Sequence, residues 1–388
     1  MKSFKKVQED RIKYHKNPNK FSVHRSSLLI PILEGQDSII SFLNHFLIKR
    51  NNNSVSLKVS AYNKKGIIID SFYEEINEKK VYKYNLSKIF NVHKNLSSFQ
   101  AEFYSSKNLF IPFPAVIIEH TSKNNKNLIH SYNRVLNDTD ENFKINREQN
   151  YESSFEAMRT NDTSTGIIFH SGANTIKGII KIKICNSSKI DSYFQKVNLP
   201  PFSTKFISLK KYLKKININY ICKIKQPKQD MFFGRLLVGS FSLKNNSFTA
   251  NHSFYLSNDT KEYFGNDESY RQYPFFHKYQ NTLKFYPINS PSIIRIYLST
   301  NEKELFCGNI KSPSQEHLSI DINNFFKNNN IKSDVYKVIA RSHKKIPTRV
   351  NHQLIIGGIG SNYPSSINVS LKNDNVYKPT GKKSYAWG

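Results

Sequence analysis

Apolar and polar residues alternate with a period of two in short runs along most of the chain, the pattern of half-buried β-strands. The clearest hairpin joins Val55–Tyr62 to Gly66–Phe72 through the polar turn Asn63-Lys64-Lys65. Runs of this kind cover residues 42–49, 55–62, 66–72, 99–104, 110–120, 129–136, 167–170, 178–185, 205–208, 220–225, 233–243, 249–256, 293–299, 304–310, 336–341, 350–356 and 366–371. Their spacing predicts a β-sandwich architecture.

One seven-residue pattern occurs three times: an apolar residue, a helix-capping residue, an aliphatic residue, two polar residues and two apolar residues. The copies are Tyr84–Phe90, Ile207–Leu213 and Ile320–Phe326. Their second residues can accept hydrogen bonds from the free amides of a helix's first turn, so each copy predicts a short helical turn between strands. A histidine follows the central aliphatic residue after 44, 43 and 30 residues, which indicates divergent copies of one domain: His130, His252 and His352.

We therefore predict an all-β fold of three tandem β-sandwich repeats, similar in strand spacing to immunoglobulin and fibronectin domains, each with a short helical turn between strands. The predicted parts are a basic N-terminal arm (1–20), repeat 1 (21–138), an acidic linker (139–165), repeat 2 (166–259), an aromatic connector (260–280), repeat 3 (281–374) and a C-terminal tail (375–388). Within the linker, Glu152–Arg159 is expected to form one or two helical turns.

Charge adds a functional question to this picture. The chain has 58 Lys and Arg residues against 29 Asp and Glu residues, a formal net charge of +29. Such an excess indicates an anionic partner, with an anionic polysaccharide first and nucleic acid second. The competing interpretation is a solvated background. Lys, Asn and Ile abound together, as in an AT-rich coding sequence, and the lysines are dispersed along the chain rather than gathered in one stripe.

The cysteines and the apolar runs argue against three classes: disulfide-rich proteins, zinc proteins with cysteine ligands and membrane-spanning proteins. Cys185, Cys222 and Cys307 cannot all pair with one another and show no Cys-x-x-Cys spacing, which argues against a disulfide scaffold and a cysteine zinc site. No apolar run predicts a membrane span, and residues 1–20 lack the apolar core of a signal peptide. We expect a cytoplasmic protein, with a virion location or non-classical export left open. Trp387 in the tail is expected to dock on its own fold or on another subunit, which would make a homo-oligomer.

Motifs of catalysis and cofactor binding do not occur: there is no phosphate-binding loop, dinucleotide fingerprint, zinc-protease motif or nucleophile elbow. We therefore assign no cofactor, no metal and no catalytic residue. Two segments hold candidate ligand-binding residues. On one strand, His130, Tyr132 and Arg134 would face the same way and form a polar surface. In the aromatic connector, the side chains that could stack on sugars or bases, or plug a contact between domains, are Tyr270, Arg271, Tyr273 and His277.

Three functions are compatible with these features. The first is a non-catalytic multi-domain β-sandwich protein that binds or scaffolds, with an anionic glycan or envelope polymer as its ligand. The second is a nucleic-acid-associated protein, whose affinity would fall with salt along a slope set by the number of phosphates it contacts. The third is an enzyme of surface-polysaccharide metabolism with a site near His130.

Overall fold

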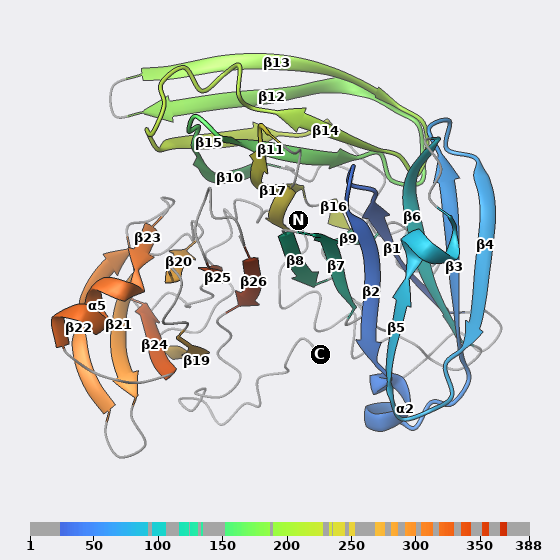
Figure 1. Ribbon diagram of the computed structural model, residues 1–388, viewed down its shortest axis with the longest axis horizontal. Coiled ribbons are helices and arrows are strands. Elements are labelled where there is room, and N and C mark those ends of the chain that lie inside the picture. Colours follow the sequence, from blue (N-terminus) through green and yellow to red (C-terminus); the bar gives the residue numbers. More distant parts are fainter. Residues whose placement is uncertain are drawn as a thin grey trace. The chain divides into compact units, whose positions relative to one another are not determined.

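The structure is a computed structural model that describes residues 24–91, 95–105, 116–123, 125–130, 133–134, 152–186, 189–227, 233–234, 236–244, 248–252, 268–275, 281–285, 292–299, 304–312, 318–329, 335–342, 351–356 and 365–370. These residues form antiparallel sheets with few helices (Figure 1). The chain divides into two compact units, one holding most residues up to 253 and the other residues 154–156 and 254–387. The predicted arm (1–20) and tail (375–388) lie outside the described residues.

The first unit begins with two four-stranded sheets. One has the order β1 (His24–Pro31), β6 (Leu96–Ser105), β3 (Val55–Asn63), β4 (Ile68–Glu75), and the other β5 (Val81–Asn85), β2 (Asp37–Leu43), β7 (Ile117–Ser122), β8 (Asn125–His130). Their apolar faces share one core, because Leu28 and Leu57 of the first sheet and Ile40 of the second are all completely buried in it. Across this core, the rings of Phe42 and Phe103 meet edge to face with centroids 5.0 Å apart.

A second pair of sheets follows. One has the order β10 (Glu152–Ala157), β15 (Tyr220–Lys225), β12 (Ile176–Asn186), β13 (Lys189–Leu199), and the other β14 (Thr204–Ser208), β11 (Thr163–His170), β17 (Leu237–Ser242), β18 (Phe248–His252). Alternation is clearest on β12, where Ile180, Ile182 and Ile184 are buried and the lysines between them are exposed. A short ladder between β9 (Asn133–Arg134) and β16 (Phe233–Gly234) connects the two pairs.

The second unit contains a third pair. Its sheets have the orders β19 (Glu268–Pro274), β24 (Val335–Ser342), β21 (Ser292–Ser299), β22 (Glu304–Ser312) and β23 (Leu318–Asp321), β20 (Asn281–Phe285), β25 (Asn351–Ile356), β26 (Ser365–Ser370). The ring of Phe275, which follows β19, stacks on Phe326 with centroids 3.6 Å apart.

The same strand order occurs in all three pairs. Counted along the chain, the strands of each pair lie as 1-6-3-4 in one sheet and 5-2-7-8 in the other. The predicted all-β, sandwich-like architecture is thus confirmed. An immunoglobulin constant domain places its first strand beside its second. Here the first strand pairs with the sixth, and the second strand pairs with the seventh. The strand order therefore differs from that of an immunoglobulin constant domain.

The three copies of the seven-residue pattern lie at the same place, between the fifth and sixth strands of each pair. The first copy forms helix α3 (Leu86–Ile89), with Asn85 Oδ1 accepting from Lys88 N at 3.1 Å. The third forms helix α5 (Ile322–Asn329), where Asp321 Oδ1 accepts from Asn323 N at 3.0 Å. The second is a turn rather than a helix, in which Ser208 Oγ accepts from Lys210 N at 3.2 Å. The central aliphatic residue is completely buried in every copy: Leu86, Leu209 and Ile322.

Strands replace part of the predicted linker and connector. The segment expected to be helical is strand β10, and β11 begins at Thr163, before the predicted start of repeat 2. The segment forms a strand because its burial alternates with a period of two: Phe155 and Ala157 are buried, and Glu156 between them is half-buried. Within 260–280, residues 268–274 form β19.

The predicted strand 42–49 is also wrong in its second half. Strand β2 ends at Leu43, and helix α2 (His45–Arg50) begins immediately afterwards. Asn44 is the cause, because its Oδ1 accepts a hydrogen bond from Leu47 N at 3.1 Å and so caps the first turn. In the described part of the chain, no helix is long and apolar enough to cross a membrane.

Candidate functional site

The described residues of the first predicted cluster fall on two named strands. His130 ends β8 opposite Ile117, whereas Arg134 lies on β9 opposite Phe233. Tyr132, between them, lies outside the described residues. The described parts of the predicted strand 129–136 thus pair with two different strands, β7 and β16. The grouping of the three residues into one binding surface stays a prediction.

The second predicted cluster lies on β19, next to β24. Tyr270 is opposite Ile339, Arg271 is opposite Val338 and Tyr273 is opposite Tyr336. Because neighbouring strand residues alternate between the two faces of a sheet, the position of Tyr270 is on the opposite face from those of Arg271 and Tyr273. His277 lies outside the described residues. The register therefore separates Tyr270 from Arg271, and their role in binding stays a prediction.

A charged surface that the sequence analysis did not single out lies on the second sheet pair, on the outer face of β15, β12 and β13. On β12 the inward residues are isoleucines, and the outward residues Lys177, Lys181 and Lys183 are exposed. On β15 the outward residues include Lys223, which is half-buried, and Lys225, which is exposed. We call this set of five residues the lysine face.

The ladder between β12 and β15 sets lysines directly against lysines. Lys181 is the cross-strand partner of Lys225, and Lys183 is the partner of Lys223. Directly opposed side chains in an antiparallel pair have Cβ atoms roughly 5 Å apart, and like charges in that position destabilise the sheet. Within the described residues, none of these four lysines makes an ion pair. Two adjacent rows of the lysine face thus carry uncompensated positive charge.

Apolar side chains flank these charges on the edge strand β13. Phe194 is opposite Lys181 and is 63% exposed, and Ile190 is 66% exposed. Ile179, on β12, is 45% exposed and faces Lys196 of β13. The described outward positions of β12, β13 and β15 carry no acid, although the next strand, β10, contains the half-buried Glu156. The surface therefore combines dense positive charge with one accessible aromatic ring.

Some lysines elsewhere in the described part of the first unit have acidic neighbours. Glu119 receives both Lys126, at 2.9 Å, and Lys83, at 3.6 Å. Asp191 lies on the other side of β13 from Phe194 and receives Lys189 at 3.1 Å and Lys214 at 3.6 Å. The hydrogen bond from Lys189 holds the pKa of the Asp191 carboxyl below its ordinary value. What distinguishes the lysine face is that its lysines lie directly opposite one another across a ladder.

On the first sheet pair, the corresponding strands do not repeat the arrangement. Lys58 of β3 lies opposite Glu102 of β6 and Tyr73 of β4. Its Nζ is 5.6 Å from the centre of the Tyr73 ring. A lysine in the same strand of the fold therefore has an acid, and not another lysine, as a cross-strand partner here.

A serine–histidine pair lies in the first core. Ser38 Oγ and His120 Nδ1 are 3.3 Å apart, and both residues are completely buried. Burial lowers the pKa of His120 to about 4, so the ring is neutral at pH 7. A pair that is sealed from solvent offers a substrate no access. Among the described residues, no group of three or more His, Cys, Asp or Glu side chains could hold a metal ion.

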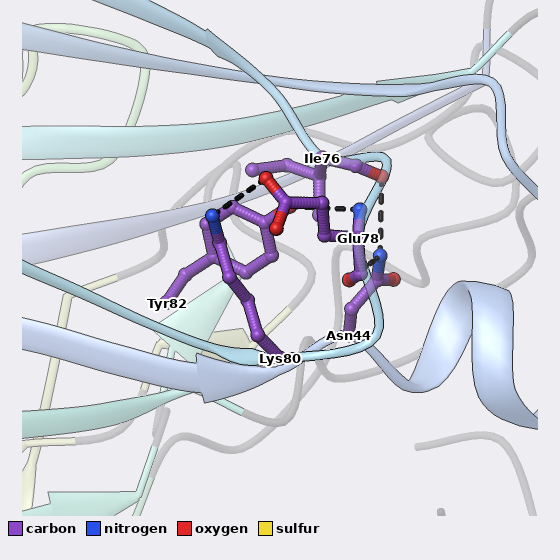
Figure 2. A network of polar contacts seen from close by, with 5 residues as sticks. All are labelled: Asn44, Ile76, Glu78, Lys80 and Tyr82. Atoms are coloured by element: carbon purple, nitrogen blue, oxygen red, sulfur yellow. Dashed lines mark hydrogen bonds and ion pairs between the residues drawn. The ribbon is translucent and has the colours of Figure 1, made fainter.

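The polar network around Asn44 stabilises the fold (Figure 2). Asn44 Nδ2 donates to the carbonyl oxygens of Ile76 and Glu78, at 3.2 Å and 2.9 Å. Tyr82 Oη accepts from Glu78 N at 3.0 Å, and Lys80 Nζ lies 2.7 Å from Glu78 Oε1 and 4.9 Å from the centre of the Tyr82 ring. Asn44 is completely buried, so the network ties α2 to the turn between β4 and β5. Its polar groups are satisfied internally, as expected of a structural element.

Comparisons with known proteins give no family: no family model and no curated protein matches the chain. Among solved structures, the chain is similar to β-glucuronidase 2 of Bacteroides uniformis covalently bound to cyclophellitol-6-carboxylate aziridine, at 7% identity and a TM-score of 0.17, over 62% of this chain and 27% of that chain. A further Bacteroides uniformis β-glucuronidase is similar at 6% identity and a TM-score of 0.16, with the same coverage. The FN1–FN3 domains of chicken CNTN1 are similar at 9% identity and a TM-score of 0.14, over 89% of this chain and 98% of that chain. The chain spans 27% of the length of the glucuronidases, and likenesses this weak carry no argument about its function.

Proposed function

We propose that this protein is a non-catalytic binding or scaffold protein built from three copies of one β-sandwich domain, and that it binds an anionic glycan or envelope polymer on the lysine face. The observation that carries the proposal is the pair of lysine–lysine rows, Lys181 opposite Lys225 and Lys183 opposite Lys223. The three identical strand orders support the proposal of repeated domains.

The opposed lysines have a cost that ligand binding would remove. Each like-charge row destabilises the free sheet by up to about 1 kcal/mol, and a bound polyanion would convert that repulsion into attraction. A ligand that binds only the folded protein also stabilises it by mass action. The lysine face is thus a surface whose electrostatic energy is least favourable when it is empty.

The composition of the surface favours a glycan over nucleic acid. Proteins that hold single strands of nucleic acid stack successive bases on successive aromatic rings. The outward positions of β12, β13 and β15 present a single ring, Phe194, whereas lysines recur along and across the strands. A surface with repeated lysines and a single aromatic ring suits a linear polymer that is recognised mainly by its regularly spaced anionic groups.

Single-stranded nucleic acid is the second candidate, and Phe194 is the observation that favours it. The ring is 63% exposed beside Lys181, where a base could stack while its phosphate meets the ammonium group. Replacing Phe194 by Ala would then weaken nucleic acid more than a glycan of similar charge.

The test is a binding panel of glycans with single-stranded and duplex DNA, run at two salt concentrations. The proteins compared are wild type, the double variant Lys181→Gln/Lys183→Gln and the control Lys79→Gln/Lys88→Gln, which removes two exposed lysines from other elements. We expect selective binding to sulfated or carboxylated glycans, lowered roughly tenfold or more by the first variant and little changed by the second.

Two results would contradict the proposal. One is equal loss of binding in both double variants, which would make the positive charge a diffuse background. The other is indiscriminate binding that disappears at moderate salt in wild type.

A further inference from the structure

Phe202 of the second sheet pair contacts the first sheet pair. Its φ of 51° lies in the left-handed region, which a bulky residue rarely adopts, so its surroundings must hold it. The Phe202 ring stacks on Tyr62 with centroids 4.6 Å apart. Phe202 N donates to Gly172 O at 2.7 Å, and Ser98 Oγ donates to Phe202 O. The two pairs are thus joined by a specific contact.

The turn between β3 and β4 belongs to the same contact. Asn63 Oδ1 accepts from Lys65 N at 2.8 Å and from Ile67 N at 3.1 Å, which fixes the turn locally. Gly66 has a φ of 76°, and a Cβ at this position would overlap the carbonyl oxygen of Pro201. Pro200 Cβ is 3.2 Å from the same point. Only glycine allows the turn to approach the segment after β13 this closely.

This approach brings a further pair of lysines to the end of the lysine face. Lys64 and Lys65, immediately before Gly66, are both exposed. Pro200 directly follows Leu199, whose cross-strand partner is Ile176, the neighbour of Lys177. Lys196 is exposed on the same stretch of β13, opposite Ile179. Positive side chains therefore continue from Lys181 through Lys177 and Lys196 to the β3–β4 turn.

We propose that a single anionic polysaccharide chain spans both sheet pairs, held at one end by the lysine face and at the other by Lys64 and Lys65. This inference rests on the proposed function and extends it, because it makes the first sheet pair part of the binding surface. The distance along β12 from Lys183 to Lys177 is about 20 Å at the rise of a β-strand. A polymer longer than that distance gains the second contact intramolecularly, so affinity rises with polymer length.

The experiment measures affinity for heparin fragments of two lengths, one limited to about 20 Å and one at least twice as long. For Lys64→Gln/Lys65→Gln, we expect the long fragment to bind roughly fivefold or more weakly and the short fragment to bind as it does to wild type. The control Lys79→Gln/Lys88→Gln, which removes the same charge elsewhere on the first pair, should leave both affinities unchanged.

A second variant pair tests the contact itself. Gly66→Ala places a methyl group against Pro201 O, whereas Gly35→Ala, at a φ of 69°, strains the backbone equally but meets no atom within 4 Å. We expect Gly66→Ala to lose the length dependence and Gly35→Ala to keep it. Circular dichroism spectra that match wild type show that each variant is folded.

The outcomes separate this inference from the proposed function. If neither fragment binds wild type, the proposed function fails and this inference fails with it. If both fragments bind equally, or if Lys64→Gln/Lys65→Gln weakens them alike, the spanning arrangement is wrong while the lysine face stands. Single-stranded DNA of the same two lengths is a parallel arm, and length dependence seen only there would overturn the choice of a glycan.

Discussion

At the scale of single residues, two buried histidines connect stability to pH. Burial lowers the pKa of His120 to about 4 and that of His170 to about 3, against an ordinary value of 6.5. The unfolded chain therefore takes up protons first as pH falls below about 6.5, and the folded state takes them up only near pH 4 and pH 3. Because the unfolded state binds more protons in this window, stability falls as pH falls.

The expected result is a free energy of unfolding that is constant above pH 7 and decreases between pH 6.5 and pH 4 by roughly 3 kcal/mol or more. Urea denaturation followed by fluorescence at a series of pH values measures it. Carboxylates add their own loss mainly below pH 5, so the interval from pH 6.5 to pH 5 isolates the histidines. A flat profile over that interval would show that these rings are not buried in their neutral form.

Single capping residues show how far residue types alone could predict the structure. Asn85 and Asp321 were expected to cap helical turns, and both accept hydrogen bonds from the backbone two or three residues ahead. Asn44 caps α2 in the same way but was read as part of a strand. Apolar residues continue on both sides of Asn44, so the local pattern hides the cap, and the bonds from its Nδ2 to Ile76 and Glu78 reach residues far along the chain.

At the scale of elements, the opposed lysines of β12 and β15 are expected to lower the stability of the sheet and to favour the binding of an anion. Lys225→Glu would place a carboxylate opposite Lys181 and replace repulsion by attraction across the ladder. We expect the variant to be more stable than wild type by about 0.5 kcal/mol, a modest gain because both positions are exposed. The same change should lower the affinity for a sulfated glycan, since the row loses one positive charge and gains a negative one.

Thermal unfolding and glycan affinity, measured on the same preparation, check this expectation. Lys79→Glu, at an exposed site in the turn between β4 and β5, is the matched charge reversal. It should leave both quantities close to wild type. A Lys225→Glu protein that is less stable than wild type, or that binds equally well, would mean that the lysine rows are not a binding device.

The elements also explain why the site was missed in the sequence. The alternation of lysines with buried isoleucines on β12 and β15 is visible in the printed chain. What the chain does not display is the register that sets Lys181 against Lys225 and Lys183 against Lys223, because β12 and β15 are separated by β13 and β14. Lysines that are dispersed along the chain are therefore gathered in space. The two clusters predicted from local runs depended on neighbours along the chain, whereas the lysine face depends on the register between strands.

At the scale of the whole molecule, one strand order is used three times while surface charge is not repeated. The sequence predicted strands, the recurring turn and a sandwich-like architecture, because these depend on alternation and capping within short segments. It could not predict that the first strand of each pair joins the sixth, because that choice depends on how two sheets close over one core. The lysine face on the second pair has no counterpart at the corresponding ladder of the first pair, so the same strand order carries different surfaces.

A lysine-protection experiment on the intact protein tests whether the lysine face binds an anionic glycan. A brief acetylation pulse, with and without a saturating sulfated glycan, is read by mass spectrometry at each lysine. We expect acetylation to slow at Lys181, Lys183, Lys223 and Lys225 and to continue unchanged at Lys79 and Lys88. Uniform slowing across the chain, or protection confined to lysines outside the second sheet pair, would contradict this expectation.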